Sequence, residues 1–325
     1  MTVLHRWSKY LLLSLILFAA FTLLLATPGP SLSARQPLAT STVETTACPS
    51  PTVYPLTISD DRGRVITIPQ RPMRIVSGAA LFTEVLFDIG AGSRVVGVAA
   101  SPDNPAEASG LPQVGPSFQP NVEKIIALKP DVIFDVMGQA RDALENAGLI
   151  VVTPVGFISH VSDILDITDA VGRVTDNCSQ AQVLAGQLSE AIVRLESRVL
   201  DLERVSSAFI YASQDSPPFF AAGRGAIESE LLARAGGRNV FADIQGVQQV
   251  GLESLINRDP DFIFTDPSQV KYFTGNKLLA NLKAVKSGQV IGIKASSVTS
   301  TRVAEALRAM AQALHPDAFP PKSHK

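Results

Sequence analysis

The sequence predicts an α/β fold of two similar lobes joined by one long helix, and three observations support this prediction. First, residues 122–135 and 252–265 align without a gap and share a glutamate, an isoleucine, a Pro-Asp pair and an Ile-Phe pair. Each stretch indicates a short helix, a break at Pro-Asp and a buried strand, which is one unit of an α/β sheet. Second, the order strand, loop, helix, glycine, strand occurs in both halves. Third, a long amphipathic segment lies between the halves.

The first half opens with a predicted hairpin, in which strands at 56–58 and 65–68 flank a turn that contains Gly63. Short apolar runs then predict further strands at 74–76, 95–98, 132–134 and 150–152. Helical spacing of apolar residues predicts helices at 83–89, 122–128, 140–147 and 160–171.

The second half follows the same order after a long helix. Asp176 and Asn177 are expected to cap that helix, which runs to about Glu203. Some 26 residues would span about 40 Å, enough for a spine that joins the lobes. Strands are expected at 209–211, 239–241, 262–264 and 290–293, and helices at 227–234, 252–258, 277–284 and 301–314.

The N-terminus is predicted to be a targeting segment. Arg6 and Lys9 precede an apolar run without charge, Tyr10–Ala26, as in an export signal. Cleavage near Ser33 or Ala34 and retention as an uncleaved membrane anchor both remain open, because the run is only slightly short for a full span. In either case the folded body is expected to lie outside the cytoplasmic membrane.

These features predict six segments: a signal peptide or membrane anchor at 1–27, a Ser/Thr/Pro-rich linker at 28–53, an N-terminal lobe at 54–175, an interlobe helix at 176–204, a C-terminal lobe at 205–316 and a tail at 317–325. The linker composition is typical of a solvated, extended tether. Cys48 and Cys178 are the only cysteines. We expect two free thiols, because a disulfide would tie a flexible tether to the start of a helix. Lipidation of Cys48 is the alternative.

Several function classes are disfavoured by what the sequence lacks. The net charge is −2 and no basic stripe is present, so nucleic acid is not an expected partner. The pair Gly90 and Gly92 lacks the third glycine of a dinucleotide fingerprint, and no nucleophile elbow occurs. His160 is the one histidine expected inside the folded body, which disfavours a multi-histidine metal site. We therefore expect no enzyme activity and no resident metal or cofactor.

A ligand cleft is expected between the lobes, because ligands of α/β sheets bind at the carboxyl ends of strands. The loops there are 77–81, 115–120, 156–159 and 213–225. The candidate ligand-binding side chains are Phe118, Gln119, Phe157, Tyr211, Phe219, Phe220 and Arg224, with Gln214 as a further polar contact. Such an aromatic wall suits a bulky, partly apolar ligand. The alternative is that some of these rings pack the interior of the lobes.

Glu123 and Glu253 occupy equivalent positions of the repeated stretch, each in the first turn of a helix. A carboxylate there stabilises the positive end of the helix macrodipole by ~0.3–1 kcal/mol, and Asn121 is the expected N-cap of the first helix. A matched pair also fits a docking surface with one anionic side chain per lobe. Both interpretations stay open on the residues alone.

The stretches at 57–77, 83–98, 120–134, 235–243 and 251–264 together resemble the substrate-binding proteins of ABC importers for cobalamin, iron–siderophores and haem. The resemblance covers roughly Leu56 to His315. It implies two Rossmann-like lobes, each of three α/β/α layers, bridged by a single rigid helix with the ligand between them. It also implies that Glu123 and Glu253 dock on arginines of a membrane permease dimer.

On this resemblance, the chain is expected to be the extracytoplasmic component of an ABC importer, held at the membrane by its N-terminal segment. It would capture an iron–siderophore or a cobalamin-type metal chelate and deliver it to the permease. The sparse charge of the cleft favours a near-neutral chelate. Tyr211, Tyr272 and His160 keep a haem-binding component open, and an anchored binding or sensing module without a permease is a further alternative.

Overall fold

The computed structural model describes residues 51–212 and 219–320, which belong to one compact unit. The expected leader at 1–27, the linker up to residue 50, Gln214 and the end of the tail lie outside the described residues. Within the part described, no helix is both long and apolar enough to cross a bilayer.

The first lobe begins with an antiparallel hairpin, β1 (Leu56–Ser59) and β2 (Val65–Ile68). The elements that follow are β3 (Ile75–Ser77), α2 (Ala80–Asp88), β4 (Val95–Val98), α3 (Val122–Ala127), β5 (Val132–Phe134), α4 (Gly138–Asn146), β6 (Val151–Val152) and α5 (Val161–Thr175). Its four-stranded sheet has the order β4-β3-β5-β6, and every neighbouring pair is parallel.

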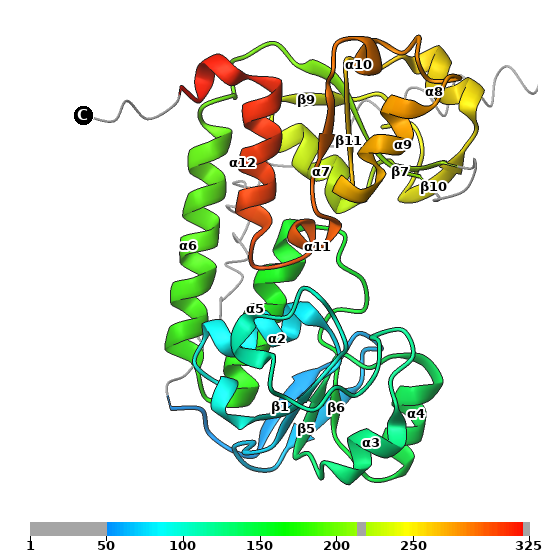
Figure 1. Cartoon of the computed structure of the whole chain (residues 1–325). Helices are drawn as coiled ribbons and strands as arrows, with labels where there is room; N and C mark the ends of the chain where they lie inside the picture. The colour runs from blue at the N-terminus through cyan, green and yellow to red at the C-terminus, as the bar shows by residue number, and fades with distance from the viewer. Residues whose placement is uncertain (1–50, 213–218, 321–325) are drawn as a thin grey trace, which may run out of the picture. The chain divides into compact units, whose positions relative to one another are not determined.

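Helices cover both faces of this sheet, because alternate residues of a strand point to opposite faces. Ile75 and Phe134 pack in a core that includes residues of α2 and α5. Their neighbours Val76 and Ile133 pack on the other face, with residues of α3 and α4. The result is a lobe of three layers, helices on each side of a parallel sheet (Figure 1).

The second lobe contains β7 (Val205–Ala212), β8 (Phe219–Ala222), α7 (Ile227–Arg234), β9 (Gly237–Asn239), β10 (Val247–Val250), α8 (Leu252–Arg258), β11 (Phe262–Thr265), α9 (Val270–Gly275), α10 (Lys283–Lys286), β12 (Val290–Gly292), α11 (Ala295–Val298) and α12 (Val303–Leu314). Strands β9, β7, β11 and β12 pair in parallel in that order, which is the strand order of the first lobe. Strands β8 and β10 extend the sheet by antiparallel pairing.

This sheet is covered in the same way as the first. Phe209 and Phe264 face a core shared with α7 and α12. Ile210 and Ile263 face a second core, to which α8, α9 and α10 contribute. The fold is therefore the two-lobed α/β architecture that the sequence predicts.

The repeated stretch has the same local structure in both lobes. Helices α3 and α8 are each followed by a residue in the left-handed region, Lys129 with φ 47° and Asp259 with φ 36°. Pro130 and Pro260 come directly afterwards, and a proline cannot continue a helix because it lacks the N–H donor. The chain then enters β5 and β11, so the Pro-Asp break predicted in both stretches is confirmed.

Helix α6 (Cys178–Glu196) joins the lobes. It packs against α2 and α5 of the first lobe and against α12 of the second, as Figure 1 shows. The helix ends before the expected position near Glu203. After Glu196 the chain goes on as turns.

The expectation of two free thiols is wrong, because Cys178 is disulfide-bonded. The one other cysteine of the chain, Cys48, lies outside the described residues.

The chain at residues 52–54 is held beside the start of α6 by hydrogen bonds. Thr52 is 7% exposed, and its N–H donates to the Asp176 carboxylate over 2.7 Å. The Tyr54 hydroxyl donates to the Val174 carbonyl over 3.0 Å. A disulfide here therefore does not have to order a loose tether.

Candidate functional site

A cavity of about 300 Å³ opens at the carboxyl ends of the first-lobe strands. Ala79–Leu81 follow β3, Asp135 and Met137 follow β5, and Val155–Ile158 follow β6, and all of these residues line it. This is the edge at which open α/β sheets bind ligands. The expected loops at 77–81 and 156–159 thus contribute to the cavity.

The second lobe completes the cavity with residues of α11 and of the segment before α12, namely Ser296, Thr299, Ser300 and Arg302. Arg302 crosses to the first lobe, where its Nη2 lies 2.6 Å from Oε1 of Glu84 in α2. The Thr301 hydroxyl donates to the other oxygen of Glu84 over 3.2 Å. Burial raises the pKa of Glu84, and the charge of Arg302 partly offsets this effect. The cavity therefore lies where the two lobes meet.

Glu230 of α7 makes a second contact between the lobes. One of its oxygens accepts the Val161 N–H over 3.1 Å and lies 3.1 Å from Nδ1 of His160. Arg234 pairs with the other oxygen at 2.7 Å. His160 is the N-cap of α5 and does not line the cavity.

Asp135 occupies an unusual backbone position in the cavity wall. Its φ of 54° lies in the left-handed region, which Asp and Asn tolerate better than other side chains. Gly78 makes this arrangement possible, since a Cβ there would come within 2.1 Å of the Asp135 carbonyl oxygen. The Gly78 N–H also donates to the Phe134 carbonyl over 2.7 Å. The loop after β3 and the end of β5 are therefore held together at the cavity.

A buried ion network lies behind Asp135. Arg141 of α4 is fully buried and pairs with Asp60 and Asp61 of the β1–β2 turn, at 2.5 Å each, and with Glu145 at 2.9 Å. Burial and then the negative charge of Asp61 raise the pKa of Asp135 to about 6, although Arg141 acts in the opposite direction. Within the described residues, no hydrogen bond or ion pair forms at the Asp135 carboxylate. Among the described residues of the lining, Asp135 is thus the charged side chain that has no hydrogen-bond or ion-pair partner.

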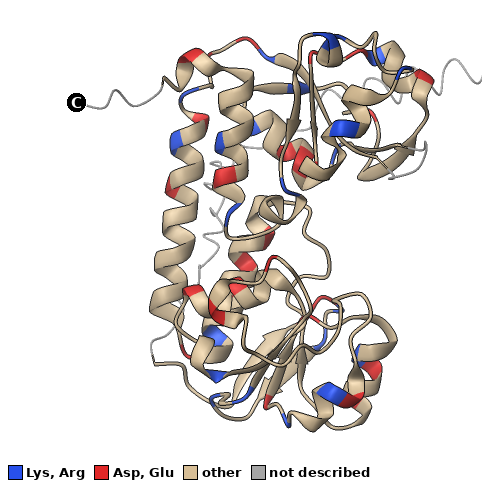
Figure 2. Ribbon diagram, in the orientation of Figure 1, with Lys and Arg blue, Asp and Glu red and all other residues tan. Residues whose placement is uncertain are grey.

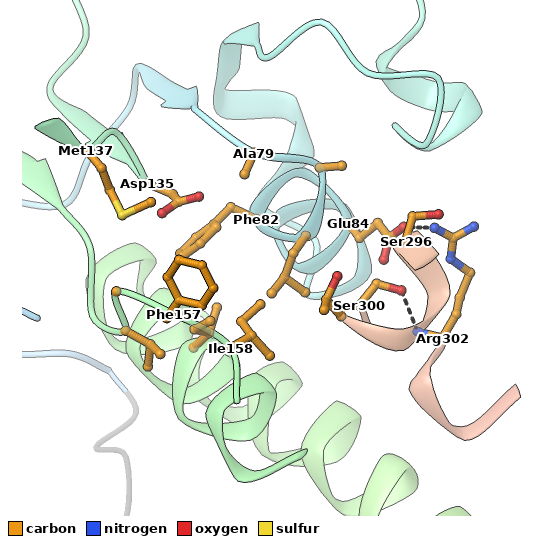
Figure 3. Close-up of a pocket in the computed structure, with 16 residues that line it drawn as sticks. Ala79, Phe82, Glu84, Asp135, Met137, Phe157, Ile158, Ser296, Ser300 and Arg302 are labelled. Atoms are coloured by element: carbon orange, nitrogen blue, oxygen red, sulfur yellow. Dashed lines mark hydrogen bonds and ion pairs between the residues drawn. The ribbon is translucent and has the colours of Figure 1, made fainter. Parts of the chain in front are cut away.

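The rest of the wall is mainly apolar. In the view of Figure 3, Met137 and Asp135 lie at the left, Phe82, Phe157 and Ile158 in the middle, and the Glu84–Arg302 pair at the right. The Phe157 side chain is 84% exposed, whereas Phe82 is buried and stacks on Phe134. An exposed ring beside a thioether and an aliphatic side chain suits a bulky ligand with an apolar face.

Among the candidate ligand-binding residues that the structure describes, Phe157 is the one that lines this cavity. Phe118, 89% exposed, and Gln119 lie in the segment before α3, outside the lining. Phe220 is partly exposed on β8. Arg224 donates to the Ala242 carbonyl over 3.2 Å.

Two other candidates pack within the second lobe instead of lining the cavity. Phe219 is 1% exposed and stacks on Phe273, with Tyr272 at its edge. The Tyr211 hydroxyl donates to Glu228 over 2.7 Å, and burial, with the nearby carboxylate of Glu228, raises the Tyr211 pKa. These rings follow the alternative interpretation, in which aromatic residues fill the lobe interior. Gln214 and its neighbours up to residue 218 lie outside the described residues.

None of the polar side chains that line the cavity was among the candidates predicted from the sequence. Asp135 could have been found, because it directly follows the buried strand 132–134 at the edge where ligands bind. Glu84 and Arg302 give no such signal, because they are far apart in sequence and meet only when the lobes pack.

Glu123 and Glu253 are exposed in the first turns of α3 and α8. The Asn121 side chain caps α3 by accepting the Lys124 N–H over 2.9 Å, as predicted. Neither glutamate has a hydrogen-bond or ion-pair partner among residues 51–212 and 219–320. Helix α3 precedes β5 and α8 precedes β11, which are equivalent strands in the parallel orders β4-β3-β5-β6 and β9-β7-β11-β12, and Figure 1 shows both helices on the side away from α6. Acidic and basic segments are interspersed over both lobes in Figure 2.

Comparison with known proteins gives a consistent result. Residues 75–296 match the periplasmic binding protein family. A Bacillus subtilis protein described as the uncharacterized ABC transporter substrate-binding lipoprotein YvrC is 28% identical over 278 residues, 82% of this chain and 88% of the relative. A cobalamin-binding protein of Halobacterium salinarum is 24% identical, over 81% of this chain and 74% of the relative. The crystal structure of an ABC-type Fe³⁺-hydroxamate transport system from Saccharomonospora viridis has a similar fold, with a TM-score of 0.69, 24% identity and coverage of 81% of this chain and 100% of that one.

Proposed function

We propose that this chain, which belongs to the periplasmic binding protein family, is the extracytoplasmic substrate-binding component of an ABC importer. The observation that supports this most is the cavity at the carboxyl ends of the first-lobe strands, completed by residues of the second lobe. A site built from two lobes can hold a small molecule and present it to a membrane partner. The relatives that share most of the chain's length are named as binding proteins rather than enzymes, which supports transport over catalysis.

The proposed cargo is a metal chelate, either an iron–siderophore or a cobalamin-type corrinoid. The mainly apolar wall with the exposed Phe157 supports a bulky organic ligand. The cobalamin-binding relative supports the corrinoid class. Haem is the alternative cargo, and the Met137 thioether on the cavity wall is the observation that favours it. An anchored binding module without a permease is the alternative to an importer component.

Glu123 and Glu253 are proposed to dock on basic side chains of the permease dimer. Their exposure, their lack of partners within the described residues and their equivalent places in the two lobes support this role. The N-terminal segment would keep the protein close to the membrane, so that docking takes place on the outer side.

The test is cargo uptake by cells that express the permease together with the chain carrying both Glu123→Ala and Glu253→Ala. Uptake should fall to the level without binding protein, while cargo affinity stays within about twofold. The matched control carries Glu190→Ala and Glu305→Ala, two exposed glutamates on other helices, and should transport normally. Loss of cargo binding in the first variant would place those glutamates at the ligand and remove the docking role.

A further inference from the structure

The cavity has an uneven charge, and this bears on the cargo proposed above. Its lining contains two carboxylates, Glu84 and Asp135, and one guanidinium, Arg302. Arg302 is paired with Glu84, so the Glu84–Arg302 end is close to neutral. Asp135 at the other end has no hydrogen-bond or ion-pair partner among the residues described. The unbalanced charge of the cavity is therefore negative and is confined to the Asp135 end.

The surroundings of Asp135 leave this charge available to a ligand. The charged groups that face it are Asp61 of the β1–β2 turn and Arg141 of α4. Arg141 already bonds to three other carboxylates, Asp61 among them. The other lining segments near it, Ala79–Leu81 and Val155–Ile158, carry no charge. A ligand group that reaches Asp135 thus meets a carboxylate in a partly desolvated wall, where electrostatic discrimination is stronger than in water.

We infer that Asp135 is a specificity-determining residue. It selects a metal chelate whose edge presents a positive charge or hydrogen-bond donors, such as ammonium, amide or hydroxyl groups. It rejects chelates that place carboxylates or other anionic groups at that end, because two like charges in a desolvated site repel. The Phe157 and Met137 side chains would contact the apolar face of the same ligand. This inference rests on the proposed function, since it assumes a chelate in this cavity.

The experiment uses two matched pairs of probes and the full-length chain in isothermal titration calorimetry at pH 7.5. One pair is a linear ferric trihydroxamate with a free terminal ammonium and its N-acetylated, neutral form. The other is cyanocobalamin and a derivative with one side-chain amide hydrolysed to a carboxylate. In whichever pair binds, the less negative member should bind the wild type at least about fivefold more tightly.

The variant Asp135→Asn removes the charge and keeps the shape, and asparagine also tolerates the left-handed backbone. It should reduce the affinity ratio within the pair to about one. The control Asp201→Asn, an exposed aspartate outside the cavity lining, should leave the ratio unchanged. The wild-type ratio should also fall toward one between pH 7.5 and pH 5, as the Asp135 carboxylate gains a proton, and Asp135→Asn should lack this dependence.

The outcomes separate the two proposals. If the wild type binds a probe pair with equal affinity for both members, or if Asp135→Asn keeps the wild-type ratio, the role of Asp135 is overturned and the chelate-binding function stands. If no member of either pair binds the wild type, the chelate-binding function fails, and the selectivity assigned to Asp135 fails with it.

Discussion

Glu84 and Arg302 lie 218 residues apart in sequence, and their side chains meet at 2.6 Å across the two lobes. Glu84 belongs to α2 of the first lobe, and Arg302 directly precedes α12. Only 8% of the Glu84 side chain is exposed, against 33% for Arg302. Because this pair borders the ligand cavity, the contact between the lobes and the shape of the binding site depend on the same two residues.

A double-mutant cycle with Glu84→Ala and Arg302→Ala should show a coupling of about 1–3 kcal/mol in unfolding free energy. Arg302→Ala should be the more destabilising single change, because it leaves a buried carboxylate without its partner. The exposed pair Glu190–Arg194, 3.7 Å apart, is the control and should show a coupling below about 0.5 kcal/mol. Equal couplings in the two cycles, measured by urea denaturation, would contradict the role of the interlobe pair.

Arg141 should be far more important for stability than Arg62, although both pair with aspartates at the same edge of the first lobe. Arg141 is fully buried, and Asp60 beside it is fully buried as well. Arg141→Met should therefore cost about 3–5 kcal/mol. Arg62 pairs with Asp142 at the surface, so Arg62→Met should cost less than about 1 kcal/mol. Urea denaturation of the two variants measures the difference, and similar costs would show that the buried network contributes little.

Asp135 should make stability depend on pH in a defined direction. Its pKa is raised from 3.8 to about 6 in the folded protein, so the folded state binds more protons than the unfolded state between these values. The unfolding free energy therefore falls as pH rises through that window, by about 3 kcal/mol at most. Asp135→Asn should lack this loss. The unfolding free energy of the variant, relative to that of the wild type, should therefore be higher at pH 7.5 than at pH 4. A difference that is constant from pH 4 to 7.5 would contradict the raised pKa.

Phe157 should contribute to ligand affinity and not to stability. Its side chain is 84% exposed at the cavity, so Phe157→Ala should change the unfolding free energy by less than about 0.5 kcal/mol. The same change should weaken cargo binding roughly tenfold, because a large aromatic contact is lost. Phe118 is equally exposed but lies outside the lining, so calorimetry of Phe118→Ala should show the smaller loss of affinity. The reverse order would move the ligand toward Phe118.

The sequence predicted the architecture well because the two lobes follow local rules. The repeated break at Pro130 and Pro260 sits where each helix ends, and the buried runs at 132–134 and 262–264 are strands. The strand predicted at 239–241 begins earlier in the structure, where β9 spans Gly237–Asn239. Glycine has a low strand propensity, so the apolar residues after it were favoured in the prediction. Strand β8 was not predicted, because residues 213–225 were expected to form a loop of the ligand cleft.

The candidate site was harder to predict, since it depends on contacts between distant parts of the chain. The loop that carries Phe157 could be placed from the strand before it. The aromatic residues Phe219 and Tyr211 could not be assigned to the cavity or to the core from residue type, and the structure packs them in the second lobe. The pairing of Arg302 with Glu84 has no local signature at all.

Binding of a metal chelate is tested most directly by a thermal-unfolding screen of the full-length chain with cyanocobalamin, ferric trihydroxamates, a ferric tricatecholate and haem. A ligand present at 100 times its Kd adds ~2.7 kcal/mol to the unfolding free energy, which raises Tm by roughly 4–5 °C for a protein of this size. Such a rise is expected with at least one siderophore or corrinoid, and a smaller rise or none is expected with the anionic tricatecholate. A panel in which none of these compounds changes Tm would contradict the assignment of a metal chelate as the cargo.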